Sequence, residues 1–131
     1  MMEATPVAKT IFVVEDDDDI ARLVSHHLEV AGFLVRRFSR ATSVVSEAEK
    51  RPPAVFLLDL MLPDMDGFDL CRDIRQNPVL RNVPIIILSA RTTAMERKRA
   101  LECGANDYVT KPFSPLDLIL RVKASCGSAA G

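Results

Sequence analysis

Five short apolar segments recur along the chain and alternate with stretches of helical pattern, which constrains the fold more than any other feature. The segments are Ile11 to Val14, Phe33 to Phe38, Val55 to Leu58, Pro84 to Leu88, and Tyr108 to Val109. The first, third and fourth are almost wholly apolar and rich in Val, Ile and Leu, which is typical of strands buried on both faces of a parallel sheet. The second and fifth are weaker, so we expect them at the sheet edges.

Helical patterns occupy the intervals between these segments. The first has an apolar stripe at i, i+3, i+4, i+7 and i+8 from Ile20, with Asp18 or Asp19 placed to cap its start and Gly32 to end it. The other four are predicted at Ser39 to Lys50, at Phe68 to about Asn77, at Ala94 to Cys103 with Gly104 as a left-handed terminator, and from Ser114 onward. Fivefold alternation of strand and helix predicts an α/β fold with a parallel sheet and right-handed crossovers.

The length of 131 residues fits one domain, and a content of 48% hydrophobic and 27% charged residues indicates a soluble globular chain. We expect a flexible N-terminal tail at residues 1–8, the domain at 9–124, and a flexible tail or the start of a linker at 125–131. The net charge of −1 offers no general argument for binding nucleic acid or membranes.

A cytoplasmic location is predicted from what the sequence lacks. Met1 to Thr10 has no apolar core typical of a signal peptide, and no apolar run approaches the ~20 residues of a membrane span. The three cysteines are scattered, without a CxxC pair, so we expect free thiols and not a disulfide framework or zinc site.

Polar residues follow the predicted strands at the edge where α/β proteins bind ligands. Acidic residues 15–19 follow the first strand, Asp59 ends the third, Ser89 follows the fourth, and Lys111 follows the fifth. The first loop contains no glycine with which to meet a phosphate, and its acids would repel a bare phosphate and attract a cation. Clustered carboxylates need a counter-charge, and an all-oxygen ligand set favours Mg²⁺.

A bound Mg²⁺ would let this edge perform phosphoryl transfer. A carboxylate can attack phosphorus to form an acyl phosphate, and such transfer depends mainly on positioning and on neutralising oxygen charge. Asp59 is the best-placed nucleophile, while Mg²⁺, the Lys111 ammonium and the Ser89 hydroxyl can each hold one phosphoryl oxygen. Each residue taken alone is more simply a cap or a surface group; their joint occurrence at successive strand ends favours a site.

Four motifs resemble the response regulator receiver domains of two-component signalling, in order and at the expected intervals. They are IFVVEDDDDI, FLLDLMLPDMDG, PIIILSAR and GANDYVTKPFSP, and the resemblance covers about residues 9–124. It is greatest to the receiver domains of winged-helix transcription-factor regulators. It implies a flavodoxin-like (βα)5 doubly wound fold, with a five-stranded parallel sheet in the order 2-1-3-4-5 and helices on both faces.

The resemblance also implies roles for individual residues around the metal. Asp59 matches the phosphoacceptor. Asp16 matches a direct Mg²⁺ ligand, Glu15 a ligand acting through water, and the backbone carbonyl of Met61 the third protein ligand.

Three further residues match the phosphate-sensing part of the family. Ser89 matches the hydroxyl that moves towards phosphate, Tyr108 the aromatic switch that follows it, and Lys111 the lysine that pairs with phosphate. The Lys111–Pro112 bond is expected to be cis.

The implied function is a signalling switch and not an enzyme acting on other molecules. A histidine kinase or a phosphotransfer protein would supply the phosphoryl group, and the domain would catalyse only its own phosphorylation and slow dephosphorylation. The face formed by the fourth helix, fifth strand and fifth helix would then control dimerisation or an output partner. In the winged-helix class this face makes a symmetric dimer. We expect no direct nucleic-acid binding by this domain, because its sequence has no basic recognition helix. The matching charge pairs here are Arg97 with Asp117, Glu102 with Lys123, and Asp107 with Arg121.

Three alternatives use some of the same residues. A haloacid dehalogenase-type phosphatase also has an Asp nucleophile at a strand end, but it needs a second Asp at the position of Met61. A calcium-binding EF-hand loop built on Asp64 and Asp66 would have Leu62 in its first ligand position, which excludes it. A receiver-like module that binds proteins without phosphorylation stays open, although every expected site residue is present.

Overall fold

Strands and helices alternate five times in the computed structural model, which describes residues 8–91 and 93–127. The strands are β1 (Thr10–Val14), β2 (Leu34–Phe38), β3 (Val55–Asp59), β4 (Ile85–Ser89) and β5 (Asp107–Thr110). The helices are α1 (Asp18–Val30), α2 (Val44–Lys50), α3 (Gly67–Gln76), α4 (Ala94–Glu102) and α5 (Pro115–Gly127). The alternation predicted from the apolar segments is confirmed.

The five strands form one parallel sheet in the order β2-β1-β3-β4-β5. Every residue of β3 and β4 is buried, whereas β2 is mostly exposed. The two weakly apolar segments therefore lie at the edges, as expected. The doubly wound strand order that the resemblance implied is also confirmed, and it puts the strand-order reversal between β1 and β3.

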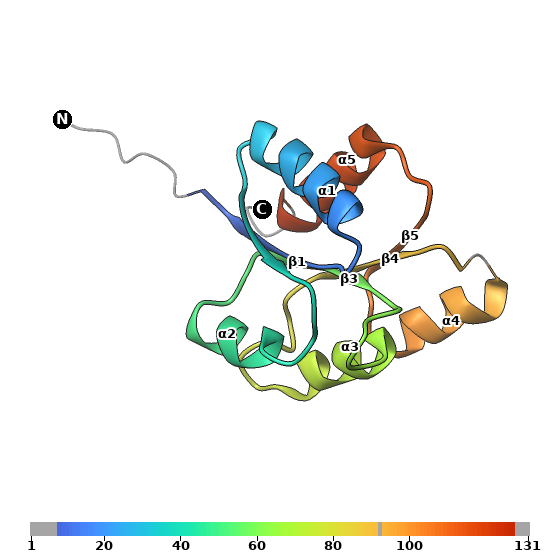
Figure 1. Ribbon diagram of the computed structural model, residues 1–131. Coiled ribbons are helices and arrows are strands. Elements are labelled where there is room, and N and C mark those ends of the chain that lie inside the picture. Colours follow the sequence, from blue (N-terminus) through green and yellow to red (C-terminus); the bar gives the residue numbers. More distant parts are fainter. Residues whose placement is uncertain (1–7, 92, 128–131) are drawn as a thin grey trace.

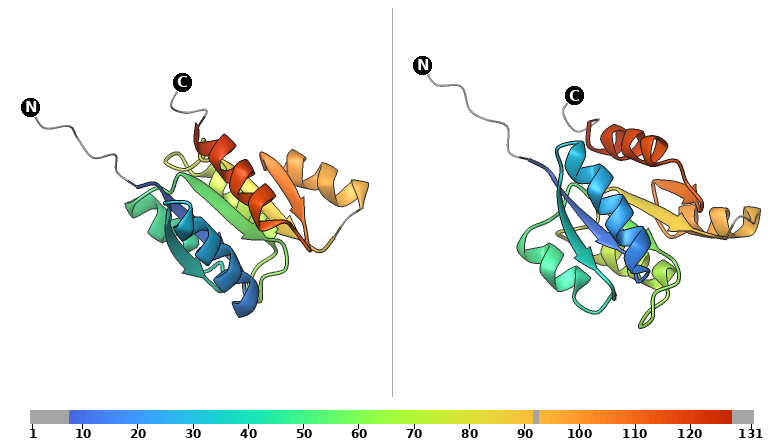
Figure 2. Two further views of the ribbon diagram at one scale, coloured as in Figure 1. Left: turned by 90° about the horizontal axis from the view of Figure 1, so that it is seen from above. Right: turned by 45° about the horizontal axis from the view of Figure 1, so that its top comes forward.

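Helices cover both faces of the sheet (Figures 1 and 2). Helices α1 and α5 lie on one face, while α2, α3 and α4 lie on the other. Because successive strand residues point to opposite faces, Ile11 and Val13 join the core under α1 and α5, and Phe12 and Val14 join the core on the opposite side.

Most helix ends agree with the sequence pattern. The N-cap of α1 is Asp17, one residue before the predicted Asp18 or Asp19, and its carboxylate accepts a 3.0 Å hydrogen bond from the Ile20 amide. Gly32 and Gly104 adopt φ of 98° and 100°, a left-handed conformation that favours glycine and ends α1 and α4.

Helix α2 is shorter than predicted, since it begins at Val44 and not at Ser39. The preceding loop is held by a contact that no local pattern indicates. The Asp64 carboxylate, from the loop between β3 and α3, accepts hydrogen bonds of 2.9 Å from the amides of Ala41 and Thr42. These amides are directed to another loop, so the chain turns before the helix starts.

Helix α5 continues to Gly127, so residues 125–127, expected as tail or linker, are helical. Residues 1–7 of the expected N-terminal tail and residues 128–131 lie outside the described part of the chain. Within the described part, the helices are all too short or too polar to cross a membrane.

Candidate functional site

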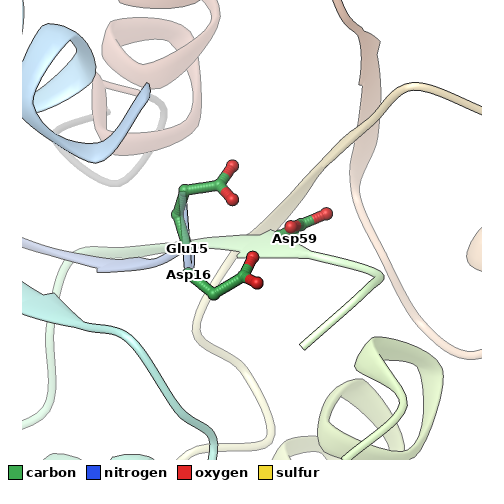
Figure 3. A group of neighbouring side chains, drawn as sticks. All are labelled: Glu15, Asp16 and Asp59. Atoms are coloured by element: carbon green, nitrogen blue, oxygen red, sulfur yellow. The ribbon is translucent and has the colours of Figure 1, made fainter. Parts of the chain in front are cut away.

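Three carboxylates meet at the carboxyl edge of the sheet. Glu15 and Asp16 follow β1, and Asp59 ends β3, which is paired with β1. One oxygen from each side chain lies within 4.8 Å of the other two (Figure 3). Glu15 and Asp59 are only 3% and 6% exposed, whereas Asp16 is open to solvent. The sequence prediction that these acids converge is confirmed by their positions.

Lys111 enters this acidic group from the end of β5. Its ammonium donates a hydrogen bond of 2.6 Å to Glu15 Oε1 and lies 3.6 Å from Asp59 Oδ2. The peptide bond to Pro112 is cis, as expected, and the Lys111 amide donates to the Ser89 carbonyl at 2.8 Å. The lysine is thus held beside both buried carboxylates.

The buried charges do not balance. Two buried carboxylates face one ammonium, so the ionised site carries excess negative charge. The pKa of Glu15 is raised to about 7, mainly by burial and then by the neighbouring Asp59, while the hydrogen bond from Lys111 acts in the opposite direction. The donors are all oxygens, and one side is open at Asp16, so these residues fit a hard divalent cation such as Mg²⁺.

Ser89 lies at the end of β4, on the strand next to Asp59. Its side chain is buried, and its hydroxyl oxygen accepts a 3.0 Å hydrogen bond from the Arg91 amide. The predicted hydroxyl is therefore at the same sheet edge as the acids. Its hydrogen-bond partner is the backbone of the loop that leads to α4.

Tyr108 on β5 is connected to the same loop. Tyr108 is 9% exposed, its hydroxyl donates a 2.7 Å hydrogen bond to the Arg91 carbonyl, and the Arg97 guanidinium lies 5.6 Å from the ring centroid. The backbone of Arg91 consequently joins Ser89 to Tyr108. The sequence interpretation missed Arg91, because a backbone contact leaves no signal in the residue type.

The loop after Asp59 folds back on itself. The Met61 amide donates to Asp59 Oδ1 at 3.2 Å, and Met61 pairs with Asp66 in an antiparallel bridge. A Cβ at Gly67 would lie 2.5 Å from the Asp59 carbonyl oxygen, so only glycine allows α3 to start so close to β3. Gly67 had no assigned role from sequence, although its place after Asp66 is a turn signal.

The predicted dimer-face residues are partly paired within the chain. The Arg121 guanidinium contacts Asp107 at 2.7 Å and Asp117 at 3.0 Å. Glu102 and Lys123 are exposed. Two of the three pairs expected between copies thus involve charges that already have an intramolecular partner.

Fold and site together define a doubly wound α/β domain with a cluster of carboxylates and a half-buried lysine at the carboxyl edge of its sheet. Residues 11–123 match the family model described as the response regulator receiver domain, and the chain belongs to this family. Members are receiver domains of two-component response regulators and act as signalling switches. Membership in this family argues against the two alternatives of a haloacid dehalogenase-type phosphatase and a calcium-binding EF-hand loop.

Relatives and solved structures agree with this assignment. The chain is 43% identical to the transcriptional regulatory protein GltR of Pseudomonas aeruginosa, covering 88% of this chain and 48% of that protein. It is 44% identical to the phosphate regulon transcriptional regulatory protein PhoB of Rhizobium meliloti, covering 87% and 50%. The chain therefore spans about half the length of these relatives. A crystal structure of a response regulator from Chloroflexus aurantiacus superposes with a TM-score of 0.88 at 35% identity, covering 92% and 99%.

Proposed function

We propose that this domain accepts a phosphoryl group on Asp59 from a phospho-histidine donor, in a Mg²⁺-dependent step. The observation that carries the proposal is the grouping of buried Asp59 with Glu15, Asp16 and Lys111 at one strand edge. This set supplies a nucleophile, a cation site and an ammonium within a few ångströms.

The chemistry follows from these groups. An Asp59 oxygen attacks phosphorus and forms a P–O bond while the P–N bond to the donor histidine breaks, and the leaving imidazole nitrogen takes up a proton. Mg²⁺ supplies positive charge that offsets the charge on the phosphoryl oxygens. Lys111, already 3.6 Å from Asp59, moves its ammonium from Glu15 towards the new phosphoryl oxygen.

The signal then passes through the loop after β4. The Ser89 hydroxyl moves to donate a hydrogen bond to a phosphoryl oxygen and no longer accepts from the Arg91 amide. This loss releases the backbone at Arg91, whose carbonyl accepts the hydrogen bond of the Tyr108 hydroxyl. Tyr108 is already buried, so the transition rearranges a packed side chain. To move from ~1% to ~99% active, phosphorylation must favour the active state by roughly 5.5 kcal/mol.

The output surface in this proposal consists of α4, β5 and α5. A phosphorylation-dependent dimer through this face is supported by the exposed opposite charges of Glu102 and Lys123 and by the similarity to transcriptional regulators. The donor would be a histidine kinase or a phosphotransfer protein, acting in the cytoplasm.

Intact mass spectrometry after incubation with acetyl phosphate and Mg²⁺ tests the proposal. We expect one added phosphoryl mass on the wild type, and none when Mg²⁺ is chelated or in Asp59→Asn. Asp69→Asn, which removes an exposed carboxylate on α3, is the matched control and should be modified like the wild type. Modification of Asp59→Asn, or none of the wild type, would overturn the proposal and favour a phosphorylation-independent module.

A further inference from the structure

The loop between β3 and α3 carries the Met61 carbonyl, and its tip is attached to a different loop. Its base is closed by the Met61–Asp66 bridge and by the 2.9 Å hydrogen bond from the Gly67 amide to the Leu60 carbonyl. Between these points lies Asp64, whose side chain crosses to the loop between β2 and α2.

Asp64 makes three hydrogen bonds across this gap. One carboxylate oxygen accepts from the Ala41 amide, and the other accepts from both the amide and the hydroxyl of Thr42. The donors lie 22 and 23 residues away in sequence, so the contact is tertiary. A charge-assisted set of this kind fixes direction as well as distance.

The contact links two loops at the ligand-binding edge of the sheet. The β2–α2 loop starts directly after Phe38, the last residue of β2, whose carbonyl accepts a 2.9 Å hydrogen bond from the Glu15 amide. The β3–α3 loop is tied to the site by the Met61 amide, which donates to Asp59. Asp64 therefore joins the loop that follows β2 to the loop that follows Asp59.

We propose that Asp64 is a positioning residue for the Mg²⁺ site, which holds the β3–α3 loop so that the Met61 carbonyl faces the carboxylates. The inference rests on the proposed function, in which that carbonyl is a metal ligand. Partners beyond the ligands themselves orient the ligands, and their loss typically weakens metal affinity about 10- to 100-fold.

The test is the Mg²⁺ dissociation constant of the intact chain, measured calorimetrically well below the melting temperature. Asp64→Ala should bind Mg²⁺ about 10-fold more weakly. Thr42→Val keeps both backbone donors and loses only the hydroxyl, so a smaller loss than in Asp64→Ala is expected. Asp69→Ala, the matched control, removes an exposed carboxylate whose contact is a surface pair with Arg72 and should change the constant less than about 2-fold.

A second readout separates positioning from general stabilisation. Without metal, hydrogen exchange at the Met61 amide should be faster in Asp64→Ala than in Asp69→Ala, while helix α5 exchanges alike in both. If Asp64→Ala fails to fold, Asp64→Asn replaces it in the comparison. If the Asp64 variant binds Mg²⁺ as tightly as Asp69→Ala does, the positioning role of Asp64 is wrong, while the proposed function is unaffected. Wild type that binds no Mg²⁺, or binds it equally after Asp16→Asn, would instead overturn the proposed function.

Discussion

Lys111 Nζ lies 2.6 Å from Glu15 Oε1, joining residues 96 positions apart in the sequence. The same ammonium lies 3.6 Å from Asp59 Oδ2, so it is closer to Glu15 than to Asp59, the proposed phosphoacceptor. Its single charge is shared between two buried carboxylates. The two carboxylates, when both are ionised, therefore exceed the charge of the ammonium between them.

The stability of the metal-free protein should depend on Glu15 between pH 4.5 and about 7. The folded-state pKa of Glu15 is raised from 4.5 to about 7, mainly by burial. Below pH 4.5 both states are protonated and the stabilisation is fully present. As pH rises the unfolded chain loses its proton first, so the stabilisation is lost up to about pH 7 and is constant above it.

Urea unfolding in chelator at about pH 5 and about pH 8 measures this effect. Wild type should lose on the order of 1–3 kcal/mol more than Glu15→Gln over that range. Saturating Mg²⁺ should reduce the difference, because the metal replaces the proton. Equal pH dependence in both proteins would show that Glu15 does not take up the proton.

Gly67→Ala should destabilise the domain and the site together. The new Cβ would meet Asp59 O at 2.5 Å and Leu60 Cα at 2.6 Å, and both are backbone atoms that cannot rotate away. We expect a loss of about 3 kcal/mol in urea unfolding, together with weaker Mg²⁺ binding.

Gly32→Ala is the matched control for that substitution. Gly32 has a left-handed φ of 98° but open space around the added Cβ, so its cost should be about 1 kcal/mol, from backbone strain alone. Its Mg²⁺ affinity should equal that of the wild type. A Gly67→Ala protein as stable as Gly32→Ala would contradict the close approach of α3 to β3.

The sequence predicts the order of elements and the members of the site because both depend on local patterns. Apolar runs mark β1, β3 and β4, and the residues that follow parallel strands must meet at one edge. Glu15, Asp59, Ser89 and Lys111 were found in this way. The strand order itself came from the family resemblance and not from the pattern.

The features that were missed are contacts between distant backbone and side-chain atoms. The start of α2 was misplaced because Asp64, about 20 residues downstream, captures the amides of the preceding loop. The link from Ser89 to Tyr108 passes through the Arg91 backbone, which is independent of the side chain. No period or motif encodes either contact.

Cys103 should react with alkylating reagents before Cys71. Burial raises the pKa of the Cys71 thiol to about 11, and its side chain is fully buried. At mildly alkaline pH the thiolate fraction of Cys71 is then about 100-fold lower than that of an ordinary thiol. Cys103 is half-buried and more accessible.

Timed iodoacetamide labelling followed by peptide mass spectrometry measures both rates in the native protein. In concentrated urea the two thiols should react at similar rates, which controls for reagent and sequence effects. Native labelling of Cys71 as fast as Cys103 would contradict the burial of the α3 face that carries it.

Dimerisation through α4, β5 and α5 is best tested with Glu102 and Lys123. Arg121 is a poor probe, because it already pairs with Asp107 and Asp117 and its loss would alter the monomer. Over residues 8–91 and 93–127, by contrast, no ion pair involves Glu102 or Lys123, so their reversal should leave the monomer intact.

Light scattering with beryllofluoride and Mg²⁺ should show a doubled mass for the wild type and a monomer in chelator. Glu102→Lys and Lys123→Glu each put like charges opposite one another across the two-fold axis, so each should weaken the dimer, on the order of 5-fold, and the double reversal should restore it. Each exposed pair contributes only about 0–1 kcal/mol, so the effect should fade as ionic strength rises above about 0.15 M. If the single reversals dimerise like the wild type at low salt, the interface lies elsewhere. If the wild type stays monomeric with the phosphoryl mimic, phosphorylation-dependent dimerisation is contradicted.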